Sequence, residues 1–556
     1  MTQKQPSKKL VKEQISTKEK VETKPKAVVL PQAEDTALKK VATVASEKGQ
    51  KSSSQKEKPV AKAQPAKAVK AEKTVAKAEK PTAKAEKPVE KKTVQKAQPQ
   101  TKQKQVEKVE TKFAEVEGDK KQADKPIAVE QEKSRKKILF VASEALPYVK
   151  TGGLADVMGA LPRELNKKGY DARVVVPLYQ DIPVTYRQAM EFVGQCYVPL
   201  AWRYQYCGIF RQKIQDVTYY FIDNEFYFKR TGLYGHYDDG ERFAFFAKAV
   251  LEAFKVVDFA PDIIHCNDWH TALLPTFLDT FYRGIDKYKD VKTVFTIHNI
   301  EFQGKYGTEL ISDVLGMPFD KRSLVMMDGC VNYMKAGIES ANCVTTVSPT
   351  YAQEILTPYF GYGMQNILIQ RQYKLRGIVN GIDTIANNPN TDKALFKNFG
   401  MLTFGDKVAN KLALQELLGL PINANIPMIG MVGRLTHQKG LDLLASVIEQ
   451  VLSLNIQLVV LGTGDGKYEG LLKEMQKKYS GKLGAIIGFS SDMASKIYGA
   501  SDMFLMPSKF EPCGLSQLLA MRYGSVPIVR ETGGLKDTVT PYNHVTGEGR
   551  GFTFCT

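Results

Sequence analysis

From Lys137 onward, short apolar runs alternate with segments of helical spacing, which leaves few folds open to the chain. The run KILFVASEA is followed by ADVMGALPRELNKKG, whose apolar residues recur at helical spacing up to a glycine, and then by ARVVVPLY. Buried strands that alternate with helices form parallel sheets covered on both faces. The sequence therefore predicts a doubly wound α/β domain.

A second series of the same kind begins after the loop and helix of residues 384–422. Its expected strands are PMIGMVGRL, IQLVVLGTG, LGAIIGFS, DMFLMPS, SVPIVRE and GRGFTF. We place one domain at 136–383, a connection at 384–424 and a second domain at 425–556. Two such sheets in one chain place a ligand between them, at the carboxyl ends of their strands. Because a fold alone gives no activity, the loops at those strand ends must supply the chemistry.

The first 135 residues differ in composition and carry nearly all of the chain's net charge of +18. Residues 1–137 contain 36 Lys and Arg against 19 Asp and Glu, whereas the remainder contains 42 against 41. The segment has a single aromatic residue, Phe113, and repeats of the type KAEKPTA. It buries too little apolar surface to offset its ordering entropy. We predict a disordered basic arm at 1–135, with transient helix as the alternative, whose charge suits a polyanionic surface.

Several other classes of protein leave signals that this sequence lacks. The N-terminus has no apolar region of a secretory signal, and no run approaches the roughly 18 apolar residues that span a bilayer. No nucleic-acid partner is expected, because the arm lacks stacking aromatic residues and no reading module is present. Seven scattered cysteines without CxxC spacing argue for reduced thiols, no structural zinc and a cytoplasmic location.

The first candidate loop is KTGGLADV, which follows the first strand and opens a helix. Gly152 and Gly153 let backbone amides approach a ligand closely, and Lys150 supplies a positive charge. These residues suit an anionic ligand. A glycine-containing turn beside a solvated lysine is the alternative interpretation.

The second candidate group is GRLTHQKG, at the start of the second series. Arg434 ends a strand, and Lys439 lies five residues later at the start of a helix. Two cations that converge on one point suit a diphosphate, whose departure needs charge neutralisation. The alternative is that Arg434 braces a domain interface.

The third group is PSKFEPCGLSQL, between a strand and an apolar helix. The amides of Cys513, Gly514 and Leu515 at the helix start can hold an anion, and Glu511 can accept hydrogen bonds from sugar hydroxyls. A glutamate in this position can also simply cap the helix. The strand-to-helix pattern then recurs in TGGL, where Thr532 and Gly533 offer a further anion site.

Two histidines, His270 of NDWH and His298 of TIHN, follow predicted strands of the first domain. A single histidine in such a place is more often a packing residue, but two of only six at equivalent strand ends leave both interpretations open. Neither has a partner at metal-ligand spacing, and no acidic pair at a strand end is placed to hold a metal on a diphosphate. We therefore predict no metal and no cofactor.

These motifs occur together, and in the same order, in one known family. They are KTGGLADV, HCNDWHTALLP, HNIEFQGKYG, KAGIESANCVTTVSPTYAQEI, VNGID, GRLTHQKGLDLL, LGTGD, PSKFEPCGLSQL and TGGLKDTV. Residues 137–556 thus resemble the bacterial glycogen/starch synthases of glycosyltransferase family 5. The resemblance implies two Rossmann-like domains of the GT-B type, with the acceptor side in the first and the nucleotide-sugar side in the second. It also implies metal-independent, retaining transfer of glucose from ADP-glucose to an α-1,4-glucan, in glycogen biosynthesis.

The resemblance further implies roles for residues of the matching motifs. The implied catalytic groups are Lys150, His270, Arg434, Lys439 and Glu511. Lys150 would contact the donor, the two second-domain cations would neutralise the departing phosphate, and the glutamate would hold the donor glucose. The implied binding residues are Glu144, Gly152, Gly153, Asp156, Asp238 or Asp239, Asn299, Gln303, Tyr498 (near the nucleotide base), Cys513, Gly514, Leu515, Thr532 and Gly533.

Two departures from the family pattern bear on these expectations. Asn387 stands where the family's WNPxTD motif has tryptophan, which concerns packing of the connection more than chemistry. The chain ends at Thr556, where members of the family continue with further helices, so we expect a truncated second domain. Two alternatives stay open: another GT-B glucosyltransferase, of the UDP-glucose or the sucrose- or trehalose-forming type, and an inactive glucan-binding fragment.

Overall fold

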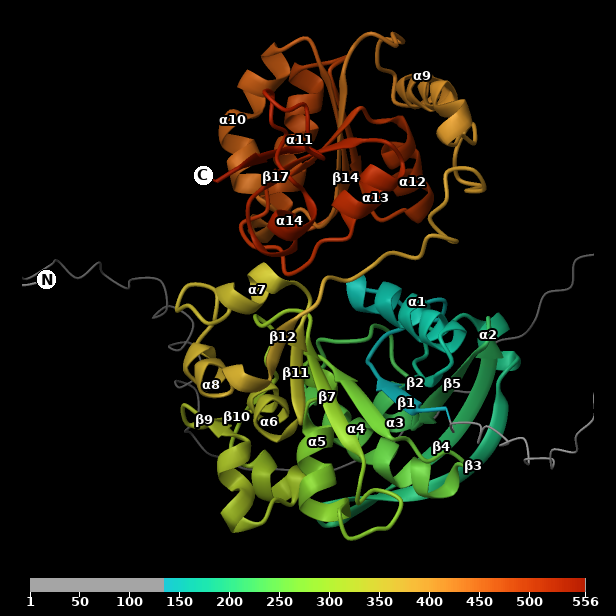
Figure 1. The fold of residues 1–556 in the computed structure, drawn as a ribbon, viewed down its shortest axis with the longest axis vertical. Helices are drawn as coiled ribbons and strands as arrows, with labels where there is room; N and C mark the ends of the chain where they lie inside the picture. The colour runs from blue at the N-terminus through green and yellow to red at the C-terminus, as the bar shows by residue number, and fades with distance from the viewer. Residues whose placement is uncertain (1–134, 556) are drawn as a thin grey trace, which may run out of the picture. The chain divides into compact units, whose positions relative to one another are not determined.

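The computed structural model describes residues 135–555, so the predicted arm lies outside the described residues except for its last position. The described residues 135–555 belong to one compact unit. Within it the described chain builds two large sheets, each flanked by helices (Figure 1). The doubly wound α/β architecture predicted from the sequence is therefore confirmed.

The first sheet has nine strands in the order β12-β11-β7-β6-β1-β2-β5-β4-β3. Seven of them run parallel. Six of these come from the apolar runs, as predicted: β1 (Lys137–Val141), β2 (Asp171–Pro177), β6 (Ile263–Asn267), β7 (Lys292–Ile297), β11 (Cys343–Thr346) and β12 (Leu375–Gly377). The seventh, β5 (Val217–Asp223), pairs parallel with β2. Their helices are α1 (Gly153–Lys167), α4 (Asp239–Val256), α5 (Leu273–Phe277), α6 (Tyr333–Ser340), α7 (Pro349–Glu354) and α8 (Gln365–Gln370). The carboxyl ends of the parallel strands share one edge, which collects the loops.

Residues 178–262 contain strands that the sequence analysis did not anticipate. The strands β3 (Glu191–Leu200) and β4 (Arg203–Ile214) form an antiparallel hairpin, and β4 also pairs antiparallel with β5 (Val217–Asp223). Two short helices, α2 (Val184–Gln188) and α3 (Glu225–Phe228), flank this part. The first sheet is therefore mixed, with β3 as an edge strand.

The apolar pattern of residues 327–341 indicates a helix over that whole stretch, but the helix α6 begins only at Tyr333. The preceding residues form β9 (Met326–Met327) and β10 (Cys330–Asn332), which join β8 (Lys305–Tyr306) in a small antiparallel sheet. The side chain of Asn332 accepts a hydrogen bond from the amide of Lys335, at 3.0 Å, and so caps α6. The cap fixes the helix start at Tyr333, a boundary that the apolar spacing alone left open.

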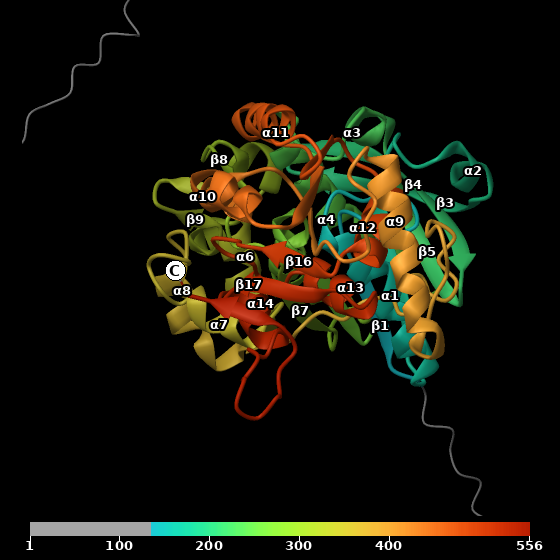
Figure 2. The same ribbon diagram turned by 90° about the horizontal axis from the view of Figure 1, so that it is seen from above.

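The second sheet has the parallel order β15-β14-β13-β16-β17-β18. Its strands are β13 (Met428–Val432), β14 (Gln457–Gly462), β15 (Leu483–Ile487), β16 (Met503–Met506), β17 (Val526–Arg530) and β18 (Phe552–Phe554). Its helices are α9 (Lys407–Leu417), α10 (Leu441–Ser453), α11 (Gly466–Lys478), α12 (Ser491–Ala500), α13 (Ser516–Arg522) and α14 (Gly533–Thr538). Figures 1 and 2 both show α9 beside α12, where Lys407 donates to the carbonyl oxygens of Tyr498 and Gly499 at 3.1 and 2.9 Å.

Membrane insertion has no support in the described helices. Over residues 135–555, none of them combines the length and the apolar character that a bilayer crossing requires.

Candidate functional site

The predicted site residues follow the carboxyl ends of β1, β6, β13, β16 and β17. Parallel strands bring their carboxyl ends to one edge of a sheet, so residues far apart in sequence meet there. Two groups result: one on the first sheet, around Glu144 and His270, and one on the second, around Lys439 and Glu511.

The KTGGL loop is held in shape by the buried carboxylate of Glu144. One carboxylate oxygen, Oε2, accepts hydrogen bonds from the Thr151 amide, from the Thr151 hydroxyl at 2.8 Å and from the Gly152 amide at 3.3 Å. Burial raises the pKa of Glu144 above its ordinary value, while the bonds from the loop act in the opposite direction. Two of the amides expected to face a ligand therefore bind a side chain of the protein itself. Lys150 bonds Asp156, across α1's first turn, at 2.7 Å.

His270 lies in a buried aromatic environment just after β6. Its ring packs against Trp269, Tyr234 and Phe243, with ring centroids 4.0, 4.4 and 4.7 Å away. Its Nδ1 lies 3.3 Å from the Ser143 hydroxyl. Burial, with a contribution from the nearby Arg242, lowers the pKa of His270 well below its ordinary value, so the imidazole is neutral at pH 7.

His298, the second histidine predicted at a strand end, is partly buried and neutral. Its Nε2 lies 3.0 Å from Oδ1 of Asn267, the last residue of the neighbouring strand β6. Burial lowers the pKa of His298 to about 4. Its position is that of a packing residue, the first of the two interpretations given above.

Asp268 is a residue of this site that the sequence analysis missed. It adopts a positive φ of 57°, which is uncommon for a residue other than glycine and marks a constrained backbone position. Its carboxylate accepts a hydrogen bond from the His298 amide at 2.7 Å. Burial raises the pKa of Asp268 to about 7. The signal in the sequence was an acidic residue directly after a buried strand, between Asn267 and the Trp269–His270 pair.

The raised pKa of Asp268 predicts a pH dependence of stability. Between pH about 4 and about 7 the folded protein retains this proton while the unfolded chain has released it, so stability falls as the pH rises through that window. From pH 5 to pH 8 the loss amounts to about 2–3 kcal/mol. In Asp268→Asn we expect the decline in the free energy of unfolding, measured by urea titration at both pH values, to be smaller by that amount. An unchanged decline would contradict the assignment.

Asp238 and Asp239, between which the sequence did not decide, occupy different environments. Asp239 is buried, bonds Arg242 and accepts a hydrogen bond from the Gly235 amide at 2.8 Å. Asp238 forms a bidentate ion pair with Arg230, with N···O distances of 2.6 and 2.8 Å. Both carboxylates therefore already have cationic partners at the start of α4.

The predicted sugar-side loop HNIEFQG is fixed by its own polar contacts. Asn299 accepts a hydrogen bond from the Glu301 amide at 3.0 Å. Gln303 is buried and donates to the carbonyl oxygens of Ile300 and Tyr362 at 3.2 and 2.9 Å. Gln303 thus ties the loop to the rest of the domain, so its contacts are those of a structural residue.

Lys439 and Glu511 meet directly on the second sheet. The Lys439 Nζ donates to Oε2 of Glu511 at 2.6 Å, and the Ser508 hydroxyl donates to the same oxygen at 2.9 Å. Glu511 is buried, whereas Lys439 is partly exposed. The residue after this lysine, Gly440, has φ +74°, and a Cβ there would lie 2.0 Å from the Pro507 carbonyl oxygen, so only glycine fits. The backbone therefore fixes the position from which the Lys439 side chain extends.

Arg434 lies on the exposed side of the same edge. It donates to Oε1 of Gln438 at 2.9 Å, a neutral partner that leaves its charge uncompensated there. The guanidinium is thus available to an anion that approaches Lys439.

The segment 513–515 packs against residues of the first domain. Cys513 is buried within that domain's core cluster, and burial raises the pKa of its thiol to about 12. Gly514 has φ +71°. A Cβ on Gly153 would lie 3.3 Å from the Leu515 side chain, so the two glycine-rich loops predicted to share one ligand do approach one another.

The Thr532–Gly533 turn is occupied by a carboxylate of the protein. Oε1 of Glu354, the last residue of α7, accepts hydrogen bonds from the Thr532 hydroxyl at 3.0 Å and the Gly533 amide at 2.9 Å. In return, Asp537 of α14 accepts from the amide and hydroxyl of Thr350 at 2.8 and 2.6 Å. Each carboxylate caps the other helix.

Tyr498 is placed differently from what a base-stacking role requires. Its side chain is buried in the core of the second domain, with its ring 5.1 Å from that of Phe504 and 6.2 Å from that of Tyr523. Phe489, two residues after β15, is instead 84% exposed at the carboxyl edge of the sheet. An exposed aromatic ring there was not singled out from the sequence.

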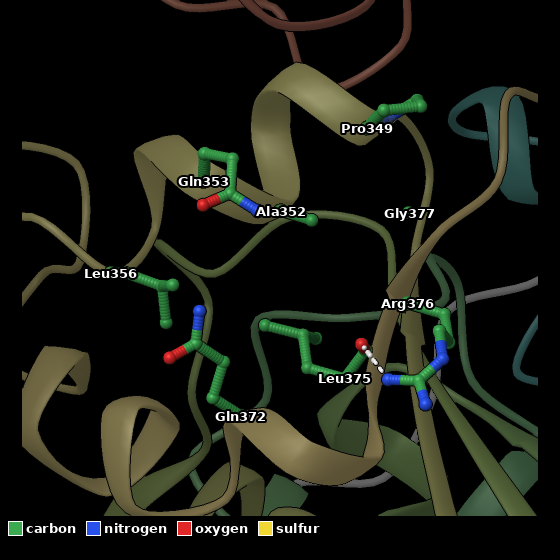
Figure 3. Close-up of a pocket in the computed structure, with 8 residues that line it drawn as sticks. All are labelled: Pro349, Ala352, Gln353, Leu356, Gln372, Leu375, Arg376 and Gly377. Atoms are coloured by element: carbon green, nitrogen blue, oxygen red, sulfur yellow. Dashed lines mark hydrogen bonds between the residues drawn. The ribbon is translucent and has the colours of Figure 1, made fainter. Parts of the chain in front are cut away.

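A hollow of about 320 Å³, half open to solvent, lies beside α7 and β12 (Figure 3). It is lined by Pro349, Ala352, Gln353, Leu356, Gln372, Leu375, Arg376 and Gly377, none of which belongs to either group. Its one charged residue, Arg376, donates to the Leu375 carbonyl at 2.7 Å. We therefore assign no catalytic role to this hollow. Among residues 135–555, no group of three or more His, Cys, Asp or Glu is arranged to hold a metal ion.

Comparison with known proteins gives matches over nearly all of the described chain. Residues 137–370 match the family model described as starch synthase catalytic domain, and 419–551 match glycosyl transferases group 1. The glycogen synthase of Clostridium acetobutylicum is 54% identical over 422 residues, which cover 75% of this chain and 88% of that protein. The glycogen synthase of Lactobacillus acidophilus is 51% identical over 420 residues, with the same two coverages of 75% and 88%.

A solved structure is similar as well. The catalytic domain of starch synthase IV from Arabidopsis thaliana, bound to ADP and acarbose, matches with a TM-score of 0.71 at 33% identity. The match covers 76% of this chain and 89% of that one.

Proposed function

This chain belongs to the bacterial glycogen synthase family, and from that premise we propose that it transfers glucose from ADP-glucose to the non-reducing end of an α-1,4-glucan, with retention of configuration. It is a glycosyltransferase of the GT-B fold that uses a sugar nucleotide as donor and a glucan as acceptor. The observation that carries the proposal is the Lys439–Glu511 pair beside Arg434, at the carboxyl edge of the second sheet. The preference for ADP-glucose draws support from the ADP in the plant structure.

The proposed chemistry rests on charge neutralisation. A diphosphate seated at Arg434 and Lys439 would find two donors that stabilise the negative charge growing on it as the glycosidic bond breaks. Glu511, which orients the lysine, has further acceptor capacity for hydroxyls of the donor glucose. The leaving phosphate would take the proton of the attacking acceptor hydroxyl on the same face, which gives retention.

On the first sheet, His270 would contribute as a neutral group. With its pKa well below the ordinary range, it can exchange a hydrogen bond but does not add positive charge at pH 7. The seven free thiols support a reducing, cytoplasmic location.

The donor and acceptor are tested by one experiment. The purified protein is incubated with glycogen and either ADP-glucose or UDP-glucose, and nucleotide release and incorporation of labelled glucose are measured. We expect release and incorporation in equal amounts, with ADP-glucose preferred. Preference for UDP-glucose, or a product of the size of sucrose or trehalose, would establish the alternative enzymes, and glycogen binding without nucleotide release the inactive fragment.

Removal of divalent metal is expected to leave this activity unchanged. The cations assigned to the diphosphate are protein side chains, so excess EDTA should not lower the initial rate of glucose incorporation. Loss of activity in EDTA that Mg²⁺ or Mn²⁺ restores would contradict the prediction.

Phe489 is assigned the stacking position for the nucleotide base. An exposed ring at the strand edge can pack face to face against a planar base, which an enclosed ring such as that of Tyr498 cannot do. Phe489→Ala should raise the KM for the donor by about tenfold with little change in kcat, since base stacking contributes roughly 1–3 kcal/mol. Phe319→Ala, which removes a ring that is 86% exposed elsewhere, is the control. An unchanged KM in the Phe489 variant would remove the assignment.

A further inference from the structure

Two cysteines face each other across the β3–β4 hairpin. The strand register places Cys196 of β3 directly opposite Cys207 of β4, and both are free thiols. Directly opposite residues of an antiparallel pair project their side chains from the same face of the sheet, so the two thiols are neighbours. In the described sheets this is the only position at which one cysteine stands opposite another.

The geometry of this pair suits a disulfide bond. Opposite residues of an antiparallel ladder have Cα atoms about 4.5 or 5.5 Å apart, and a disulfide joins residues whose Cα atoms are about 4.4–6.8 Å apart. The Cβ atoms, about 4.5–5.5 Å apart in such a pair, would have to approach to about 3.5–4.5 Å. In the described nine-stranded sheet β3 is an edge strand that pairs with β4 alone, so it is free to make this small movement.

The two thiols of this pair are not equivalent. Cys196 is partly exposed, whereas Cys207 is fully buried. A hydrogen bond with the Cys207 thiol lowers the pKa of Cys196, although burial acts in the opposite direction, and the same contact raises the pKa of Cys207. The nearest charged groups, Glu252 and Lys255 of α4, form an ion pair with each other at 2.7 Å, so their charges largely cancel. Cys196 is therefore the thiol that ionises first and that a reagent meets first.

We propose that Cys196 and Cys207 are a redox-active dithiol, which a low-molecular-weight disulfide converts to a disulfide bond within the hairpin. The Cys196 thiolate attacks one sulfur of the small disulfide, whose S–S bond breaks and releases one small thiolate. The Cys207 thiol then gives its proton to that thiolate and attacks the Cys196 sulfur, which releases the second small thiol. The two protein thiols are thereby oxidised and the small disulfide is reduced to two thiols. An excess of small thiol reverses both steps.

This dithiol is separate from the residues assigned to glucose transfer. β3 and β4 lie at one edge of the nine-stranded sheet, beyond β5 and β2, whereas the assigned residues of this domain follow β1 and β6 (Figure 1). An accessible thiol of lowered pKa beside a second thiol that can resolve it is the arrangement of redox-sensing cysteines, whose disulfides form transiently in a reducing compartment. The disulfide would fasten the edge strand β3 to β4.

The disulfide is detected by peptide mapping of the full-length chain. The protein is incubated with glutathione disulfide, the remaining thiols are blocked with N-ethylmaleimide, and the denatured protein is digested with trypsin without reductant. Cleavage after Arg203 separates peptide 188–203, which carries Cys196, from peptide 204–211, which carries Cys207. We expect mass spectrometry to find these two peptides joined in most of the molecules, and to find them separate after treatment with dithiothreitol.

Single variants test the order of the two steps. Cys207→Ala should accumulate one glutathione on Cys196, because the thiol that resolves the mixed disulfide is missing. Cys196→Ala should leave Cys207 unmodified, because that thiol is buried and protonated. Cys330→Ala is the matched control: Cys330 is also a partly exposed cysteine of a strand, but Met327 stands opposite it. This variant should form the linked peptides to the same extent as the wild type.

Three results would overturn the proposal. The first is that the two peptides stay separate in the oxidised wild-type protein. The second is a link between two copies of the chain, which a mixture of ordinary and isotope-labelled protein would reveal as joined peptides of mixed label. The third is uptake of glutathione by Cys207 in Cys196→Ala as fast as by Cys196 in Cys207→Ala, because the two thiols would then be equivalent.

Discussion

Replacement of Lys439 by alanine is expected to lower kcat for glucose transfer by about 10²–10³, and replacement of Arg434 to lower it by a similar factor. Each change removes one positioned donor from the charge that develops on the leaving diphosphate. The KM for the donor should change less, because the contact strengthens in the transition state. Initial rates of nucleotide release with saturating glycogen measure the effect.

Lys478 provides a matched control for this prediction. It forms an ion pair with Glu449 at 2.7 Å, nearly the length of the Lys439–Glu511 pair, but on the exposed surface of α11. Lys478→Ala should leave kcat within a factor of two of the wild-type value, since exposed pairs contribute about 0–1 kcal/mol to stability. Near-normal turnover in both the Lys439 and Arg434 variants, with thermal unfolding unchanged, would remove the diphosphate assignment.

Replacement of Glu511 by glutamine is expected to lower kcat by about 10². The amide keeps the shape of the side chain but removes the charge that orients Lys439 and accepts the Ser508 hydroxyl. Because the two side chains touch, their effects should not multiply: Lys439→Ala/Glu511→Gln should lose at least tenfold less than the product of the two single losses.

The exposed Lys478–Glu449 pair is the control for this prediction as well. Glu449→Gln, alone and with Lys478→Ala, should give effects on kcat that are small and independent. A multiplicative loss in the Lys439–Glu511 double variant would mean that the two residues act separately, and Glu511 would then lose its role in orienting the lysine.

The sequence predicted the parallel part of the fold well, because buried parallel strands are continuous apolar runs. The hairpin β3–β4 escaped, since its strand residues alternate polar and apolar and its exposed tyrosines interrupt any apolar stretch. The start of α6 was placed early for a related reason: Cys330 and Val331 are apolar whether they form a strand or a helix. An apolar pattern indicates that residues are buried, and buried residues occur in strands and in helices alike.

The positions of the site residues at strand ends could be predicted from the sequence, but the side chains that they contact could not. Lys439 and Glu511 are 72 positions apart in the sequence, so their pairing depends on the chain between them folding back to the same edge. Asp268 was not singled out from the sequence, because its positive φ and its burial depend on how the backbone is folded. Glu354, which binds Thr532 and Gly533, lies on the other domain, and although it belongs to the motif KAGIESANCVTTVSPTYAQEI, nothing in that motif indicates its partner. The assigned roles of these residues, and the domain boundaries, stay predictions.

The carboxylate of Glu144 has a consequence for the kinetics of donor binding. A glycine-rich loop that orders only when a ligand arrives slows association, and fixing each residue carries an entropy cost of about 1–2 kcal/mol. Here the amides of Thr151 and Gly152 are bound to Glu144 of the protein itself. A donor that contacts this loop, as the family resemblance implies, would meet a surface that needs no rearrangement at this point, and its association rate should be set by diffusion and orientation. In Glu144→Gln, whose uncharged amide is a weaker acceptor for the two backbone donors, the same rate should fall and depend on how often the loop adopts its bound shape.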